Sequence, residues 1–150
     1  QAKEAGETDL QMNVLSDIWR LCNLIGDVQM AQECNVAMDS LAEQTTDEVS
    51  KMTYYNLQAE KAMRQENYRV AEQWLFRSVS LAEASTSGKL GSLAGIPYFK
   101  LSELYLKAGR YDDCIAYAKK YMEPPHEEMS AVGLYRFMGY GQIMAEAYRY

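Results

Sequence analysis

Few side chains in this sequence have the chemistry and spacing of a catalytic or metal-binding site. The only histidine, His126, stands in the turn-like segment 124–128, beside two glutamates. A general base or a metal centre needs converging partners, and none accompanies His126 at a recognisable spacing. We therefore interpret His126 as a solvated turn residue, and we expect no catalytic residue, no metal ligand and no cofactor.

The cysteines and paired carboxylates also favour a structural interpretation. Cys22, Cys34 and Cys114 lie in apolar periodic segments, with no CxxC pair and no histidine at ligand spacing. They are predicted to be small core residues rather than nucleophiles or zinc ligands. Asp112 and Asp113 stand at an expected helix start, where carboxylates suit the helix dipole. The sequence therefore favours a protein that is not an enzyme.

Composition is that of one globular domain. The chain has 150 residues, of which 48% are apolar and 24% charged, with only 9 glycines and 3 prolines. This scarcity of turn residues favours long helices. A net charge of -6 argues against a nucleic-acid partner, and no apolar run is long enough to insert into a membrane. Because the chain starts at Gln1 without a leader sequence, we expect it to be a fragment of a longer protein.

A short pattern recurs three times. Each copy is a helix end, a polar turn, an apolar residue and, three positions later, a small residue. Val28, Tyr68 and Tyr111 are the apolar residues of the three copies, at intervals of 40 and 43 residues. Apolar residues on both sides of each turn are spaced by three and four, which is typical of amphipathic helices. The sequence therefore predicts repeated helical hairpins.

The helices that should form these hairpins can be placed by their apolar stripes and boundary residues. Their expected ranges are 8–25, 28–43, 47–65, 68–84, 91–108, 111–122 and 127–148. Thr45 and Glu48 have the spacing of a capping box, which predicts a helix start there. The predicted fold class is all-α: an α-solenoid of three antiparallel helix hairpins, at about 8–43, 47–84 and 91–122, plus a terminal helix.

The segment from Tyr98 to Ile115 resembles a tetratricopeptide repeat. Tyr98, Leu101, Ser102 and Tyr105 match the large, large, small, large set of that family's first helix, Gly109 and Tyr111 match its turn, and Cys114 matches the small residue that opens its second helix. The middle copy matches more loosely, because Gln58 replaces a large apolar residue, and the first copy is weaker still. The family repeat has about 34 residues, so longer helices or links are implied here.

In this family, the first helix of each hairpin lines a concave groove that binds a peptide or a partner helix. The resemblance places the following residues on that groove: Asn56, Glu60, Met63, Arg64, Phe99, Glu103, Leu106 and Lys107, with Thr53, Ile96 and the first-repeat residues Asn13, Ser16, Arg20, Asn23 and Leu24. The alternative is that these side chains only solvate the inner face. Family members that clamp a C-terminal carboxylate carry Asn at the positions of Glu60 and Glu103, so a mixed apolar and charged ligand is implied instead.

The resulting hypothesis is a protein- or peptide-binding scaffold module. Two alternatives remain: a ligand-sensing repeat region of a bacterial signalling or transcriptional regulator, and a self-association module. The terminal helix suggests the second, because its apolar stripe would leave a face uncovered and allow a homodimer through that helix. That stripe consists of Leu134, Phe137, Met138, Gly141, Met144, Ala145 and Tyr148, with Tyr135, Tyr140 and Ile143 beside it.

Overall fold

Helices account for all the regular structure in the part of the chain that the computed structural model describes, which is residues 2–88, 90–122, 141–143 and 145–149. The elements are α1 (Ala2–Ile25), α2 (Val28–Gln44), α3 (Glu48–Arg64), α4 (Tyr68–Ala84), the short 3₁₀ helix η1 (Gly91–Gly95), α5 (Ile96–Lys107) and α6 (Tyr111–Met122). Residues 141–143 and 145–147 are also helical. Since these ranges contain no strand, the all-α class is confirmed for them. Most of the predicted terminal helix at 127–148 lies outside the described residues.

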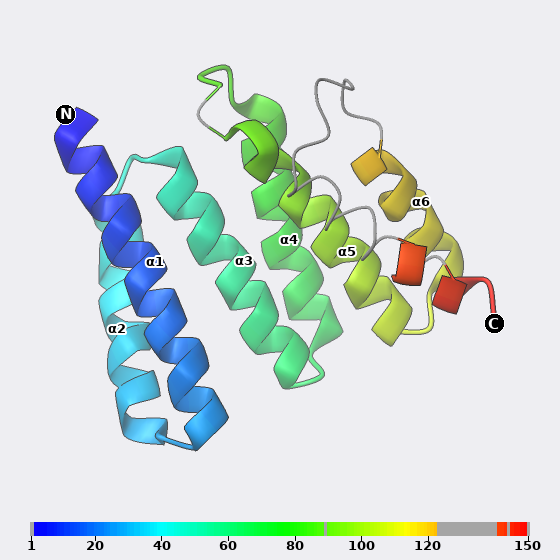
Figure 1. Cartoon of the computed structure of the whole chain (residues 1–150), viewed down its shortest axis with the longest axis horizontal. Helices are drawn as coiled ribbons and strands as arrows, with labels where there is room; N and C mark the ends of the chain where they lie inside the picture. The colour runs from blue at the N-terminus through cyan, green and yellow to red at the C-terminus, as the bar shows by residue number, and fades with distance from the viewer. Residues whose placement is uncertain (1, 89, 123–140, 144, 150) are drawn as a thin grey trace.

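The helices pack mainly against their neighbours in the chain. The pairs α1–α2, α3–α4 and α5–α6 are in contact, and Figure 1 shows them following one another in chain order from the N-terminus to the C-terminus. The first helices of the pairs also touch, since α1 contacts α3 and α3 contacts α5. We call these three helices the first-helix row. No helix in the described ranges is both long and apolar enough to span a bilayer.

The three turns inside the hairpins share one backbone geometry. Gly26, Glu66 and Gly109 have positive φ angles of 81°, 56° and 71°. The next amide in each turn donates to a carbonyl five residues earlier: Asp27 to Cys22 at 2.9 Å, Asn67 to Ala62 at 2.9 Å, and Arg110 to Tyr105 at 2.8 Å. This is the helix-ending bond of a Schellman motif, which a left-handed residue makes possible. The repeat seen in the sequence is therefore a repeat of structure at these turns.

Side-chain caps refine the expected boundaries. In the first two turns Asp27 and Asn67 accept from the amides of Met30 and Val70, and so begin α2 and α4. The predicted capping box at Thr45 is wrong, because Asp47 caps α3 by accepting from the Ser50 amide at 2.8 Å. Thr45 instead ends α2. Asp47 stands directly before the helix and offers a carboxylate, which makes it the better cap.

The expected helix at 91–108 begins five residues later than predicted. Residues 91–95 form the 3₁₀ helix η1, and the α-helix starts at Ile96, with Pro97 in its first turn. Proline suits this position because its missing amide has no helical partner there anyway. The segment between α4 and α5 is thus a longer link than the one between α2 and α3. It accounts for the wider spacing of the third repeat.

Consecutive hairpins are joined by the same kind of hydrogen bond. The Tyr54 hydroxyl donates to Asp39 at 2.9 Å, and the Tyr98 hydroxyl donates to Glu83 at 2.9 Å. In both cases a tyrosine on the first helix of one hairpin reaches the second helix of the preceding hairpin. Burial, then the carboxylate partner, raises the pKa of both tyrosines to about 12, so both hydroxyls remain donors at neutral pH.

Two clusters of buried apolar residues stabilise the fold. The first cluster joins α1 and α2 and includes Leu57 of α3; its members are Met12, Trp19, Cys22, Ala31, Cys34, Met38 and Leu57. The second runs from α3 through α6 to the C-terminal segment, and its members are Ala59, Ala62, Ala71, Leu75, Val79, Leu101, Leu104, Tyr105, Cys114, Ile143 and Ala147. All three cysteines are buried and free, as predicted.

The C-terminal segment buries a different face from the expected one. Ile143 and Ala147 are only 7% and 3% exposed and belong to the second cluster, whereas Gly141, Ala145 and Tyr148 are exposed. Ile143 had been expected beside the apolar stripe rather than in its packed centre. The pair at positions i and i+4 combines a large β-branched residue with a small one, which allows close approach to the core. The rest of the proposed dimer face lies outside the described residues.

Candidate functional site

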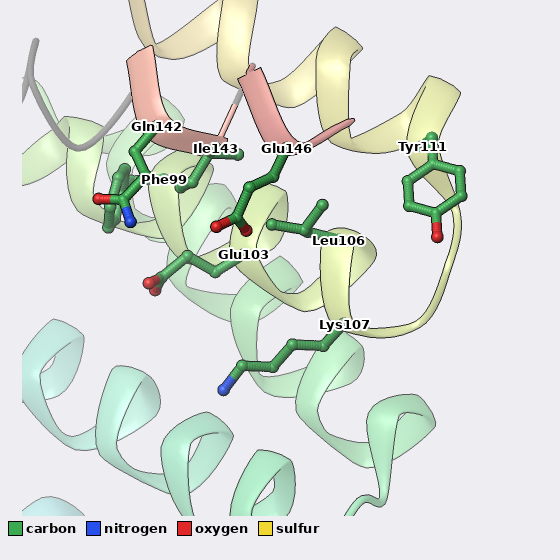
Figure 2. A pocket seen from close by; sticks show the side chains of 8 residues that line it. All are labelled: Phe99, Glu103, Leu106, Lys107, Tyr111, Gln142, Ile143 and Glu146. Carbon is green, nitrogen blue, oxygen red and sulfur yellow. The ribbon is translucent and has the colours of Figure 1, made fainter. Parts of the chain in front are cut away.

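A cleft of about 510 Å³ opens on the first-helix row, at its C-terminal end. Its lining residues come from three elements: Phe99, Glu103, Leu106 and Lys107 from α5, Tyr111 from α6, and Gln142, Ile143 and Glu146 from the C-terminal segment (Figure 2). Helical spacing brings the four α5 residues to one side of the helix, since they are separated by four, three and one positions. Four of the five third-repeat positions named from the sequence therefore share one surface, and Ile96 is the exception.

The opposite wall of the cleft comes from the C-terminal segment. Figure 2 shows the Gln142 amide beside the Phe99 ring and the Glu146 carboxylate above α5, between Glu103 and Leu106. Ile143 anchors this wall because it is part of the second core cluster. Sequence reasoning did not assign Gln142, Glu146 or Tyr111 to the site. The i, i+4 spacing of Gln142 and Glu146 puts both on one helix side, but nothing in the sequence shows that this side faces α5.

Charge is distributed unevenly over the cleft. Burial raises the pKa of Glu103, the positive charges of Lys100 and Lys107 oppose this, and the negative charge of Glu60 adds to it. Among the described residues, Glu103 forms neither a hydrogen bond nor an ion pair. The cleft thus combines apolar side chains with a carboxylate that has nearby lysines but no direct hydrogen bond or ion pair among the described residues. Such a surface suits an apolar side chain that carries or adjoins a positive charge.

The middle of the first-helix row is held by ion pairs. Glu60 on α3 accepts from Arg20 of α1 at 3.3 Å and from Arg64 at 3.4 Å, and Arg20 also pairs with Asp17 at 3.1 Å. Lys61 and Arg64 each lie 5.5 Å from the centre of the Trp19 ring. Glu60 and Arg64 therefore form a charged surface whose groups pair with one another and with Arg20 of α1.

Other expected groove residues are turned inward. Asn56 is only 6% exposed, and its side-chain oxygen accepts from Ser78 of α4 at 3.0 Å, so it belongs to the α3–α4 interface. Ser16 is buried and donates to the Met12 carbonyl at 2.7 Å. Met63 is partly buried and packs against the second core cluster. These three differ from the groove positions that the resemblance implies, because small or flexible side chains at the margin of a helix stripe can pack on either side of it.

The remaining first-helix positions are scattered. Asn13 donates to Asp9 at 3.1 Å and Asn23 to the Trp19 carbonyl at 2.7 Å, both within α1. Leu24 is among the most exposed apolar side chains of the described residues. Thr53 and Ile96 are partly buried. The structure therefore brings together Phe99, Glu103, Leu106 and Lys107 in the cleft. It also joins Glu60 and Arg64 with Arg20, but it does not gather the other first-repeat positions.

Side chains that could act as nucleophiles are poorly placed for chemistry. Burial raises the pKa of the Cys34 and Cys114 thiols, which keeps them protonated at neutral pH. No group of three or more His, Cys, Asp or Glu side chains within the described ranges could hold a metal ion. His126 lies outside those ranges. The described cleft itself offers shape, apolar surface and charge.

Comparisons with known proteins add no information on the cleft. The chain matches no family model, no curated protein and no solved structure.

Proposed function

We propose that this chain is a protein- or peptide-binding scaffold module, organised as an α-solenoid of tetratricopeptide-like hairpins, whose ligand lies in the cleft on α5 and extends along the first-helix row. The observation that carries this proposal is the cleft itself, where four residues named from the sequence line one opening together with Gln142 and Glu146. The three equivalent turns and the two equivalent tyrosine bonds support a repeated hairpin architecture.

The cleft favours a segment of another polypeptide over a small metabolite. It is open rather than enclosed, and the charge of Glu60, which pairs with Arg64 and Arg20, acts on Glu103 in its wall. Phe99 and Leu106 provide apolar contact, while Glu103 provides charge. An anchor residue in an apolar pocket surrounded by polar groups is the usual arrangement of a peptide-recognition surface.

Peptide selection on the immobilised chain tests this proposal. Random peptides displayed on phage are selected for binding, and the selected peptides are then measured by calorimetry against the unaltered protein and against Phe99→Ala and Leu106→Ala. We expect each substitution to weaken binding by more than about tenfold, because it removes apolar contact at the centre of the site. Circular dichroism confirms that each variant is folded.

Phe76→Ala is the matched control. Phe76 is a partly exposed phenylalanine on α4, away from the cleft. Its replacement should change the affinity by less than about twofold. Selected peptides that bind the Phe99→Ala and Leu106→Ala proteins with unaltered affinity would place the binding surface elsewhere, and a selection without any specific binder would count against a peptide-binding role.

A further inference from the structure

The outer side of α1 carries an uncovered apolar stripe along most of the helix. Its members, all between 37% and 82% exposed, are Leu10, Val14, Ile18, Leu21, Leu24 and Ile25. Five of them are spaced by four, four, three and four residues, so they form one continuous stripe. The opposite side of the same helix is also apolar, because Met12, Trp19 and Cys22 are buried in the first core cluster. A helix that is apolar on two sides is normally covered on both.

Most of the exposed large apolar side chains of the described structure lie at its N-terminal end. Val28, Met30 and Val36, in the same hairpin, are the next exposed large apolar side chains, and elsewhere in the described ranges only Phe76 and Tyr148 join them. Single exposed apolar residues are normal, but a contiguous stripe on a soluble protein usually marks an interface. The first hairpin is therefore the part of the described chain most in need of a partner.

We propose that the outer stripe of α1 binds the same stripe of a second copy of this chain, as an antiparallel two-fold pair of helices. A two-fold interface requires a surface that is complementary to itself. Antiparallel pairing centred between Asp17 and Ile18 sets Leu10 opposite Ile25 of the other copy. Val14 then lies opposite Leu21 of the other copy. Leu10, Val14, Leu21 and Ile25 thereby meet apolar partners, and Ile18 lies next to the two-fold axis.

Charge distinguishes the antiparallel pair from a parallel one. Asp17 borders the stripe with a side chain that is 79% exposed. A parallel two-fold would align the helix dipoles, which is unfavourable, whereas the antiparallel pair sets them in opposite directions. In the antiparallel pair Asp17 lies near Arg20 of the other copy. Arg20 pairs with Asp17 within its own chain as well, so the charges at the centre of the interface balance.

The size of the stripe is consistent with a stable pair. From Leu10 to Ile25 it extends about 22 Å at the rise of an α-helix. Covering it would bury on the order of 500 Å² of apolar surface on each chain, a large part of the roughly 800 Å² per partner in a standard interface. The cleft on α5 lies at the other end of the row, so the pair leaves it open.

Light scattering behind a size-exclusion column tests the proposal on the whole 150-residue chain. We expect a dimer of twice the 17.1 kDa chain mass at micromolar concentration. Val14→Glu combined with Leu21→Glu should weaken self-association by more than about 100-fold, because the dimer would bury unpaired carboxylates. The neutral pair Val14→Gln and Leu21→Gln should weaken it less, but in the same direction. A monomer at high micromolar concentration, or a dimer that both double variants leave unchanged, would overturn the proposal.

Val36→Glu is the matched control, because Val36 is equally exposed but lies on α2. It should leave the dimer intact, and loss of the dimer in this variant would point to a different interface. The antiparallel register is tested with Ile18→Cys, since Ile18 lies next to the two-fold axis. A short bis-maleimide should link two Ile18→Cys chains but not two Val36→Cys chains. If the Ile18→Cys chains remain unlinked in a dimer, the register is wrong.

Discussion

The two ends of the described helix row differ in how their outer apolar sides are covered. An end hairpin has another hairpin on one side only and leaves its outer side without cover. At the C-terminal end, the chain supplies its own cover, because the described residues 141–143 and 145–147 bury Ile143 and Ala147 against the second core cluster. At the N-terminal end, α1 leaves Leu10, Val14 and Leu21 exposed. The first and third hairpins therefore share the same turn geometry but differ in whether another segment of the chain covers their outer side.

The largest expected effect comes from removing the cover at the C-terminal end. Ile143→Asp places a carboxylate inside an apolar cluster and should destabilise the protein by about 3–5 kcal/mol. Ala145→Asp, two residues away on the exposed side, should cost less than about 0.5 kcal/mol. Urea denaturation followed by circular dichroism measures both. Equal costs would mean that the C-terminal segment does not stabilise α5 and α6, and the contrast between the two ends would disappear.

An intermediate effect on stability is expected at the turns inside the hairpins, which share one backbone geometry. Gly109→Ala forces a side chain into a left-handed conformation and should destabilise the protein by about 1–2 kcal/mol, although open space surrounds the new Cβ. Glu66 already occupies that conformation without being glycine. Glu66→Gly should therefore stabilise the protein by up to about 1 kcal/mol. Thermal unfolding of both variants checks this, and a destabilised Glu66→Gly protein would show that the middle turn is held by other contacts.

The smallest expected effect on stability concerns two glutamates of the first-helix row. Glu60 pairs with two arginines, whereas Glu103 has no ion-pair partner among the described residues. Burial raises the pKa of Glu103 in the folded state above its ordinary value of 4.5. At neutral pH its charge therefore destabilises the fold, and this cost disappears as the pH falls through the raised pKa. We expect Glu103→Gln to be more stable than the unaltered protein at pH 7.

This advantage should be reduced or absent at pH 4, where Glu103 is protonated in the folded state. Urea denaturation at both pH values measures the difference, with Glu43→Gln on exposed α2 as the control for a lost charge. A Glu103→Gln protein whose advantage is the same at both pH values would show that burial of the carboxylate is not the cause.

The repeated part of the fold could be predicted from sequence because its signals are local. Val28, Tyr68 and Tyr111 begin α2, α4 and α6, as the turn pattern indicated. Boundaries set by competing residues were predicted less well. Asp47 caps α3 in place of Thr45, and α5 begins at Ile96, with Pro97 in its first turn, after a 3₁₀ segment that has no periodic signal. Both are choices between nearby alternatives of similar energy.

The cleft could be predicted only in part. Helical spacing put Phe99, Glu103 and Leu106 on one side of α5, but it did not show that Asn56 turns toward Ser78. The opposite wall depends on where a segment more than thirty residues away packs. Periodicity within that segment does not single out the side that meets α5, because the exposed Ala145 and Tyr148 are apolar as well as the buried Ile143. Contacts distant in sequence are set by the whole core.

The buried cysteines make the two ends chemically distinguishable. Cys22 and Cys34 lie in the first hairpin and Cys114 lies in the third, each within a core cluster. A thiol in such a position reacts with an alkylating reagent only when the surrounding helices open. The rate of alkylation at each cysteine therefore reports the local unfolding of its own hairpin. A comparison of these rates can therefore show whether the first hairpin, whose outer side is uncovered, opens before the third.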